Sequence, residues 1–145
     1  MTTRMNMQTV APDAYKAVFG LEKYARANVD PTLYELVKLR ASYLNGCAYC
    51  IDMHTKAAIA AGETTQRLFG LAAWRDTEFF TSRERAAIAL TDEVTRLGPD
   101  GVTDEVWDGA AKAFSERELA DLLMAIATIN VWYRIAIPTR AVPGT

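Results

Sequence analysis

The sequence has few of the residues that carry redox and metal chemistry, with two cysteines and one histidine among 145 residues. Long apolar runs are also missing: no stretch of 18 or more apolar residues suits a membrane-spanning helix. The amino-terminal segment has no apolar core of the kind that a signal peptide needs. These absences predict a cytoplasmic protein.

An excess of positive charge is absent as well, because 16 Lys and Arg face 18 Asp and Glu for a net charge of -2. No basic run or basic helix face could follow a phosphate backbone, so we expect neither a nucleic-acid nor a membrane partner. Hydrophobic residues make up 50% and charged residues 23%, a composition typical of soluble globular proteins. The length suits one domain over residues 1–145.

Signals for β-strands are nearly absent, whereas helix signals recur along the chain. Pro12 and Pro31 are typical of first helical turns. Two segments, TSRE and SERE, fit the capping box in which a hydroxyl and a glutamate satisfy helix-end donors. We expect helices over 12–28, 31–45, 47–61 and 65–74, and further helices after Thr81, Thr103 and Ser115, the last ending at Pro138. The predicted fold is an all-α, single-domain bundle of six or seven helices.

Both cysteines and the histidine lie within eight positions of one another, as Cys47, Cys50 and His54. On a helix these three share a face with Ala58 and Ala61, which should point inward. In a reducing compartment a structural disulfide is rare, so the C-x-x-C spacing indicates metal binding or redox chemistry.

Three chemistries were weighed for this cluster. A c-type haem requires the histidine directly after the second cysteine, where this chain has Ile51. A zinc site could use the two cysteines and His54 with Glu35 as a fourth ligand, although structural zinc ligands usually come from two separated pairs. A dithiol that cycles with a disulfide needs only a small adjustment, since helical i, i+3 Cβ atoms lie about 5–6 Å apart and a disulfide prefers about 3.5–4.5 Å.

Glu35 lies twelve positions before Cys47, and the pattern Glu35, Cys47, Cys50, His54 resembles the AhpD-like alkylhydroperoxidases of the carboxymuconolactone decarboxylase-like superfamily. The resemblance extends over about residues 30–95, which would form the motif-bearing core. It implies an AhpD-like helical fold and a cysteine-based peroxidase with no cofactor and no metal. Cys50 would attack the peroxide, Cys47 would resolve the sulfenic acid, and His54 with Glu35 would relay protons.

The same resemblance implies partners that the residues do not identify. These are a hydroperoxide substrate, a dithiol reductant such as a lipoyl-bearing protein, and further copies of the chain in a trimer or hexamer. One departure is Tyr49, which stands where the best-known members of the group have a further histidine between the cysteines.

Two other functions remain open at the level of sequence. The dithiol could serve a general disulfide oxidoreductase or redox sensor with little peroxidase activity. The same residues could instead belong to a non-catalytic zinc-binding module.

Overall fold

The computed structural model describes residues 2–143, and the regular structure in that range is helical apart from an isolated bridge between Gly98 and Gly101. The elements are α1 (Met7–Val10), α2 (Pro12–Asn28), α3 (Pro31–Asn45), α4 (Ala48–Ala60), α5 (Thr65–Gly70), the 3-10 helix η1 (Leu71–Asp76), α6 (Ser82–Thr95), α7 (Asp104–Ala113) and α8 (Glu116–Thr139). The all-α prediction is confirmed. The prediction of six or seven helices did not include the one-turn helix α1, because that segment has no apolar periodicity in the sequence.

The predicted helix starts are formed by the expected side chains. Asp30 caps α3 by accepting from the Leu33 N–H, and Pro31 occupies the first helical turn. Both capping boxes are complete, one at the start of α6 and one at the start of α8. Side chains that satisfy the free N–H groups at a helix end thus fix where these helices begin.

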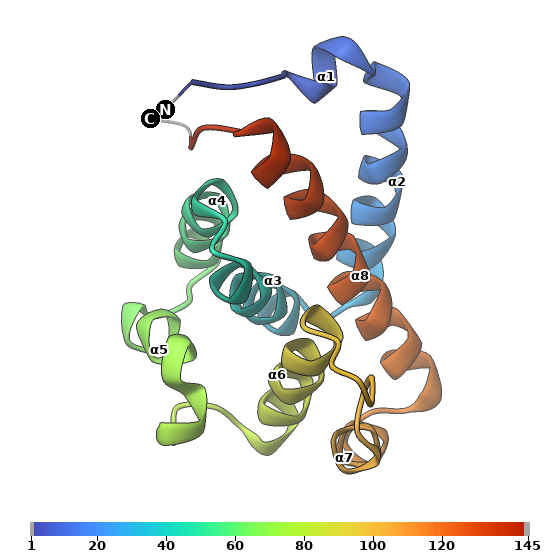
Figure 1. Ribbon diagram of the computed structural model, residues 1–145. Helices are drawn as coiled ribbons and strands as arrows, with labels where there is room; N and C mark the ends of the chain where they lie inside the picture. The colour runs from blue at the N-terminus through green and yellow to red at the C-terminus, as the bar shows by residue number, and fades with distance from the viewer. Residues whose placement is uncertain (1, 144–145) are drawn as a thin grey trace.

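The predicted end of the last helix at Pro138 is wrong, because α8 continues to Thr139. A proline in the last turn removes only one N–H donor, and little helix remains after it to be disrupted. The helix ends at Arg140, which adopts a left-handed conformation with φ of 54°. The carbonyl of Thr139 then accepts from the backbone N–H of Arg4, so the segment before α1 lies beside the end of α8 (Figure 1).

Helix α3 occupies the centre of the molecule and packs against α4, α6 and α8 (Figure 1). Seven consecutive residues, 33–39, are buried, so the helix is enclosed on all sides rather than along one stripe. Its interior therefore includes two ionisable side chains, Glu35 and Lys38, as well as apolar ones.

Helix α8 is long and apolar enough to cross a membrane when judged by length and composition alone. In this fold its middle section belongs to the core, where Ala125, Ile126 and Ile129 are buried. The helix lies beside α2 and α3 (Figure 1). The middle of α8 thus packs as part of the helical core.

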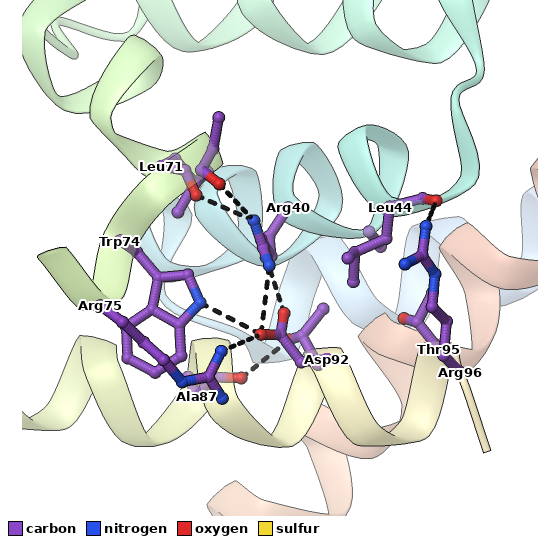
Figure 2. Close-up of polar contacts among 12 residues, drawn as sticks. Arg40, Leu44, Leu71, Trp74, Arg75, Ala87, Asp92, Thr95 and Arg96 are labelled. Carbon is purple, nitrogen blue, oxygen red and sulfur yellow. Dashed lines mark hydrogen bonds and ion pairs between the residues drawn. The ribbon is translucent and has the colours of Figure 1, made fainter. Parts of the chain in front are cut away.

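A network around Asp92 holds η1 against α3 and α6 (Figure 2). Arg40 of α3 donates to both carboxylate oxygens of Asp92, at 2.6 and 3.2 Å. Trp74 Nε1 and Arg75 donate to Asp92 Oδ2 at 3.1 and 3.0 Å. One carboxylate thus connects three elements, so it should matter for stability more than an exposed ion pair does.

We expect Asp92→Asn to lower the free energy of unfolding by about 2–3 kcal/mol, because a neutral amide leaves the Arg40 guanidinium in the interior without its counter-charge. Asp52→Asn is the matched control, since Asp52 pairs with Lys56 at the surface and its loss should cost less than about 1 kcal/mol. Urea unfolding measures both, and equal losses would contradict a stabilising role for the Asp92 network.

Candidate active site

The turn between α3 and α4 brings the two cysteines against the central helix. Gly46 ends α3 in the left-handed conformation, with φ of 64°, which glycine adopts without steric cost. Cys47 is then the N-cap of α4, and its Sγ accepts from the Cys50 N–H at 3.2 Å. The predicted helix 47–61 is thus confirmed with one residue fewer in regular structure at either end, and both cysteines lie in its first turn.

The two cysteines form a disulfide in this structure, with their Cα atoms 5.3 Å apart. Both are buried, with 2% of Cys47 and 1% of Cys50 exposed. The C-x-x-C pair can therefore take up the oxidised state within the fold. Among residues 2–143, no group of three or more His, Cys, Asp or Glu side chains is arranged to hold a metal ion.

Glu35 and His54 meet between α3 and α4, as the motif predicts. His54 Nδ1 lies 3.6 Å from Glu35 Oε2, and both residues are buried. Within the described residues, Glu35 Oε2 and His54 Nε2 have no hydrogen-bond partner. A buried polar atom without a partner is costly, and such atoms gather where a substrate or a proton is handled.

Burial lowers the pKa of His54, and the Lys38 charge acts in the same direction, while Glu35 opposes the shift. The imidazole is therefore neutral at neutral pH and can accept a proton. The pKa of His54 is lower in the folded protein than its unfolded value of about 6.5. The stability that neutral His54 contributes is therefore fully present above about pH 6.5 and is lost as the pH falls below it.

The shared helix face is largely confirmed. Cys47, Cys50, His54 and Ala58 are all buried. Ala61 was predicted to continue this face, and that prediction is wrong because Ala61 is exposed. It is the C-cap of α4, and the chain leaves the helix direction there through Gly62, whose φ is 97°.

A second charged pair, which was not predicted from the sequence, lies beside the motif and consists of Glu22 of α2 and Lys38 of α3. Lys38 is 1% exposed, and its Nζ donates to Glu22 Oε1 at 2.5 Å and to Tyr34 Oη at 2.9 Å. Trp132 Nε1 donates to the other Glu22 oxygen at 3.1 Å. The signal available in the sequence was a lysine inside the apolar run LVKL, in a helix with little polar surface.

Burial alone would raise the pKa of Glu22, but the Lys38 ammonium and the hydrogen bonds from Lys38, Tyr34 and Trp132 outweigh it and hold the pKa at about 2. Burial also lowers the pKa of Lys38, and Glu22 opposes that shift. Glu22 thus stays ionised, and its negative charge is largely compensated within the fold.

A cavity of about 640 Å³ opens beside the motif. Its walls come from the amino-terminal segment, α2, α3, α4, α8 and the residues that follow α8. Cys50, His54 and Glu35 line it, whereas Cys47 is not among the lining residues and packs with Ala41, Ile129 and Tyr133. Of the four motif residues, the cavity therefore reaches all except Cys47.

Aromatic rings form part of the cavity lining. Tyr15, Phe19 and Trp132 meet edge to face, with ring centroids 5.1–5.3 Å apart. Tyr49, at the position of the missing histidine, is half-buried and also lines the cavity. Trp132 thus lines the cavity, while Tyr133 is a core residue and Trp107 is 40% exposed.

The fold and site define a class of small all-α proteins with a C-x-x-C disulfide at a helix start. Within that class, the chain belongs to the Carboxymuconolactone decarboxylase family, whose profile matches residues 12–93. It is 38% identical over 138 residues to the uncharacterized protein YdfG of Bacillus subtilis, with 94% of each chain covered. It is also 46% identical to the alkyl hydroperoxide reductase AhpD of Rhodopseudomonas palustris, but over only 41 residues, or 28% of this chain and 23% of that one.

Solved structures share the fold over nearly the whole chain. ATU0492 of Agrobacterium tumefaciens, a protein of unknown function named as a candidate antioxidant defence protein AhpD, superposes with a TM-score of 0.96 at 35% identity and 99% coverage of both chains. The debrominase Bmp8, bound to 2,3,4-tribromopyrrole, gives a TM-score of 0.85 at 20% identity, covering 95% of this chain and 74% of that one. At that identity the likeness shows the fold alone.

Lys38→Met should destabilise the protein by about 3–5 kcal/mol, because it leaves the Glu22 carboxylate buried without its counter-charge. The double variant Glu22→Gln with Lys38→Met should recover much of that loss, since neither charge then remains. Urea unfolding of both variants tests this. A single variant as stable as the unmodified protein would show that the pair contributes nothing to the fold.

Proposed function

We propose that the protein is a thiol-dependent peroxidase that reduces hydroperoxides through Cys50 and Cys47. The observation that carries this proposal is that one cavity is lined by Cys50, His54 and Glu35, while Cys47 lies behind Cys50 at disulfide distance. Membership of a family with a hydroperoxide reductase among its relatives supports the same chemistry.

The cycle has three balanced steps. The Cys50 thiolate attacks one oxygen of the peroxide, the O–O bond breaks, and a sulfenic acid forms as water or an alcohol leaves with one added proton. The Cys47 thiol then attacks the sulfenic sulfur, a second water leaves and the disulfide forms. A dithiol reductant exchanges with this disulfide and restores both thiols.

A low thiol pKa alone cannot supply the rate. Lowering it from about 8.5 to about 6.5 raises the thiolate fraction at pH 7 about 25-fold, but intrinsic nucleophilicity falls about 8-fold, leaving a gain of about threefold. A positioned proton donor and acceptor contributes about 10²–10⁴-fold. We assign that role to His54, oriented by Glu35.

The position of α4 supports Cys50 as the attacking residue. The helix dipole favours a thiolate near the amino terminus of a helix, and its effect falls off within the first turn. Because α4 begins at Ala48, Cys50 is the third residue of the helix and still lies in the first turn. Both thiols therefore benefit from the amino-terminal dipole, and access from the cavity distinguishes them.

The reductant and the assembly are further parts of the proposal. We propose a dithiol, such as a lipoyl group carried on a protein, as the reductant that enters through the same cavity. We also propose that the chain works as a homo-oligomer of three or six copies. Exposed apolar side chains near the cavity, including Phe19, Met53 and Ile137, are consistent with such contacts.

The test of the function is a stopped-flow reaction of the reduced protein with cumene hydroperoxide, with thiol loss and disulfide formation followed by mass. One equivalent of peroxide should consume two thiols per chain. Cys50→Ser should abolish the reaction, and Cys47→Ser should stop at a sulfenic acid on Cys50. Thiols that react no faster than free cysteine would reject the peroxidase. Rapid exchange with disulfides in that case would favour a general oxidoreductase.

His54→Gln should slow the peroxide reaction by about 10²–10⁴-fold, because glutamine keeps the polarity but cannot take up a proton. In the unmodified protein the limb of the pH–rate profile that reports protonation of His54 should lie below about pH 6.5, since burial lowers its pKa. This limb should disappear in the variant. An unchanged rate and profile would exclude His54 from the relay.

A further inference from the structure

The cavity at Cys50 is much larger than hydrogen peroxide requires. Its volume of about 640 Å³ falls in the range of about 300–1,000 Å³ that is typical of sites for drug-sized ligands. The aromatic wall of Tyr15, Phe19 and Trp132 is joined by Met53 and Ile135. Such a lining favours a substrate with a substantial apolar part.

One end of the cavity carries positive charge. Five lining residues come from α2, and two of them, Lys23 and Arg26, are cations beyond the aromatic rings of that helix. Glu22 lies between Phe19 and these cations along α2. Its negative charge is compensated by the buried Lys38 ammonium, whose Nζ lies 2.5 Å from Glu22 Oε1, and its second oxygen accepts from Trp132. The end of the cavity next to α2 is therefore net positive.

Arg26 is held in place while keeping donors available. One of its nitrogens donates to Glu22 at 3.0 Å, and its guanidinium lies 5.4 Å from the centroid of the Tyr34 ring. The side chain is nevertheless 62% exposed, and a guanidinium has five N–H donors in all. A carboxylate could bind it while the bond to Glu22 remains.

We propose that the cavity takes organic hydroperoxides that carry a carboxylate, of the kind formed from fatty acids. The carboxylate binds at Lys23 and Arg26, the apolar chain lies along the aromatic wall, and the peroxide group reaches Cys50. Reduction then releases the corresponding hydroxy acid, with the two Cys50 and Cys47 thiols oxidised to the disulfide. This proposal rests on the proposed peroxidase function for its chemistry, but not for its binding.

A matched pair of substrates tests the charge. Linoleic acid hydroperoxide and its methyl ester, both kept below their aggregation concentrations, differ at the carboxylate. The reduced protein should react with the acid about three- to tenfold faster than with the ester, as expected for exposed charge pairs. The variant Lys23→Gln with Arg26→Gln should lose that preference. Lys16→Gln, on the same helix but outside the cavity lining, should keep it.

A binding measurement separates this inference from the peroxidase function. Titration of the disulfide form with decanoate and with decanol, followed by calorimetry, requires no reaction. Decanoate should bind about three- to tenfold more tightly, and only the Lys23 and Arg26 double variant should abolish the difference. Equal binding of the two ligands, with equal rates for acid and ester, would overturn the inference and leave the peroxidase standing. Preferential decanoate binding without any peroxide reaction would support the anion site and reject the peroxidase.

Discussion

Dehydration of two charged side chains on the central helix constrains the rest of the site. Helix α3 is enclosed by its neighbours, so Glu35 and Lys38 are removed from water along with the apolar residues around them. A buried charge is tolerated only with partners, and each of these residues recruits one from another helix. Lys38 binds Glu22 of α2, and Glu35 faces His54 of α4.

These two pairings differ in how completely they are satisfied. Lys38 donates hydrogen bonds to Glu22 and Tyr34, and Trp132 Nε1 donates to the second oxygen of the Glu22 carboxylate. Glu35 and His54 are separated by 3.6 Å, and each retains a buried atom without a partner. A satisfied network stabilises a fold, whereas an unsatisfied one leaves capacity to bind a substrate or move a proton. One pair is thus fully hydrogen-bonded, and the other is the pair to which the proposed mechanism assigns the proton relay.

Much of the architecture could be predicted because its signals are local. The caps at Asp30, Thr81 and Ser115 act within four residues, and the motif on α4 follows helical periodicity. Glu35 could be paired with His54 only through the resemblance to a known family. The pair of Glu22 and Lys38 was missed because the two residues come from different helices. In the sequence Lys38 lies three positions after Glu35, and this spacing is typical of a solvated helix face unless the enclosure of α3 is known. The missed α1 and the cavity walls likewise depend on how distant segments pack.

The unpartnered atoms at the site are best understood through the redox state of the cysteines. In the disulfide neither sulfur carries a proton, and His54 Nε2 and Glu35 Oε2 have no hydrogen-bond partner among the described residues. Reduction would restore a thiol proton on Cys50, four positions before His54 on α4, and in the proposed mechanism this thiol is the donor to His54. The thiol proton that must leave before Cys50 can act as a nucleophile is therefore present only in the reduced form, whereas neutral His54, its proposed acceptor, is present in both forms. Burial lowers the pKa of His54 and keeps the imidazole neutral, which is the state that the proposed proton transfer from Cys50 requires.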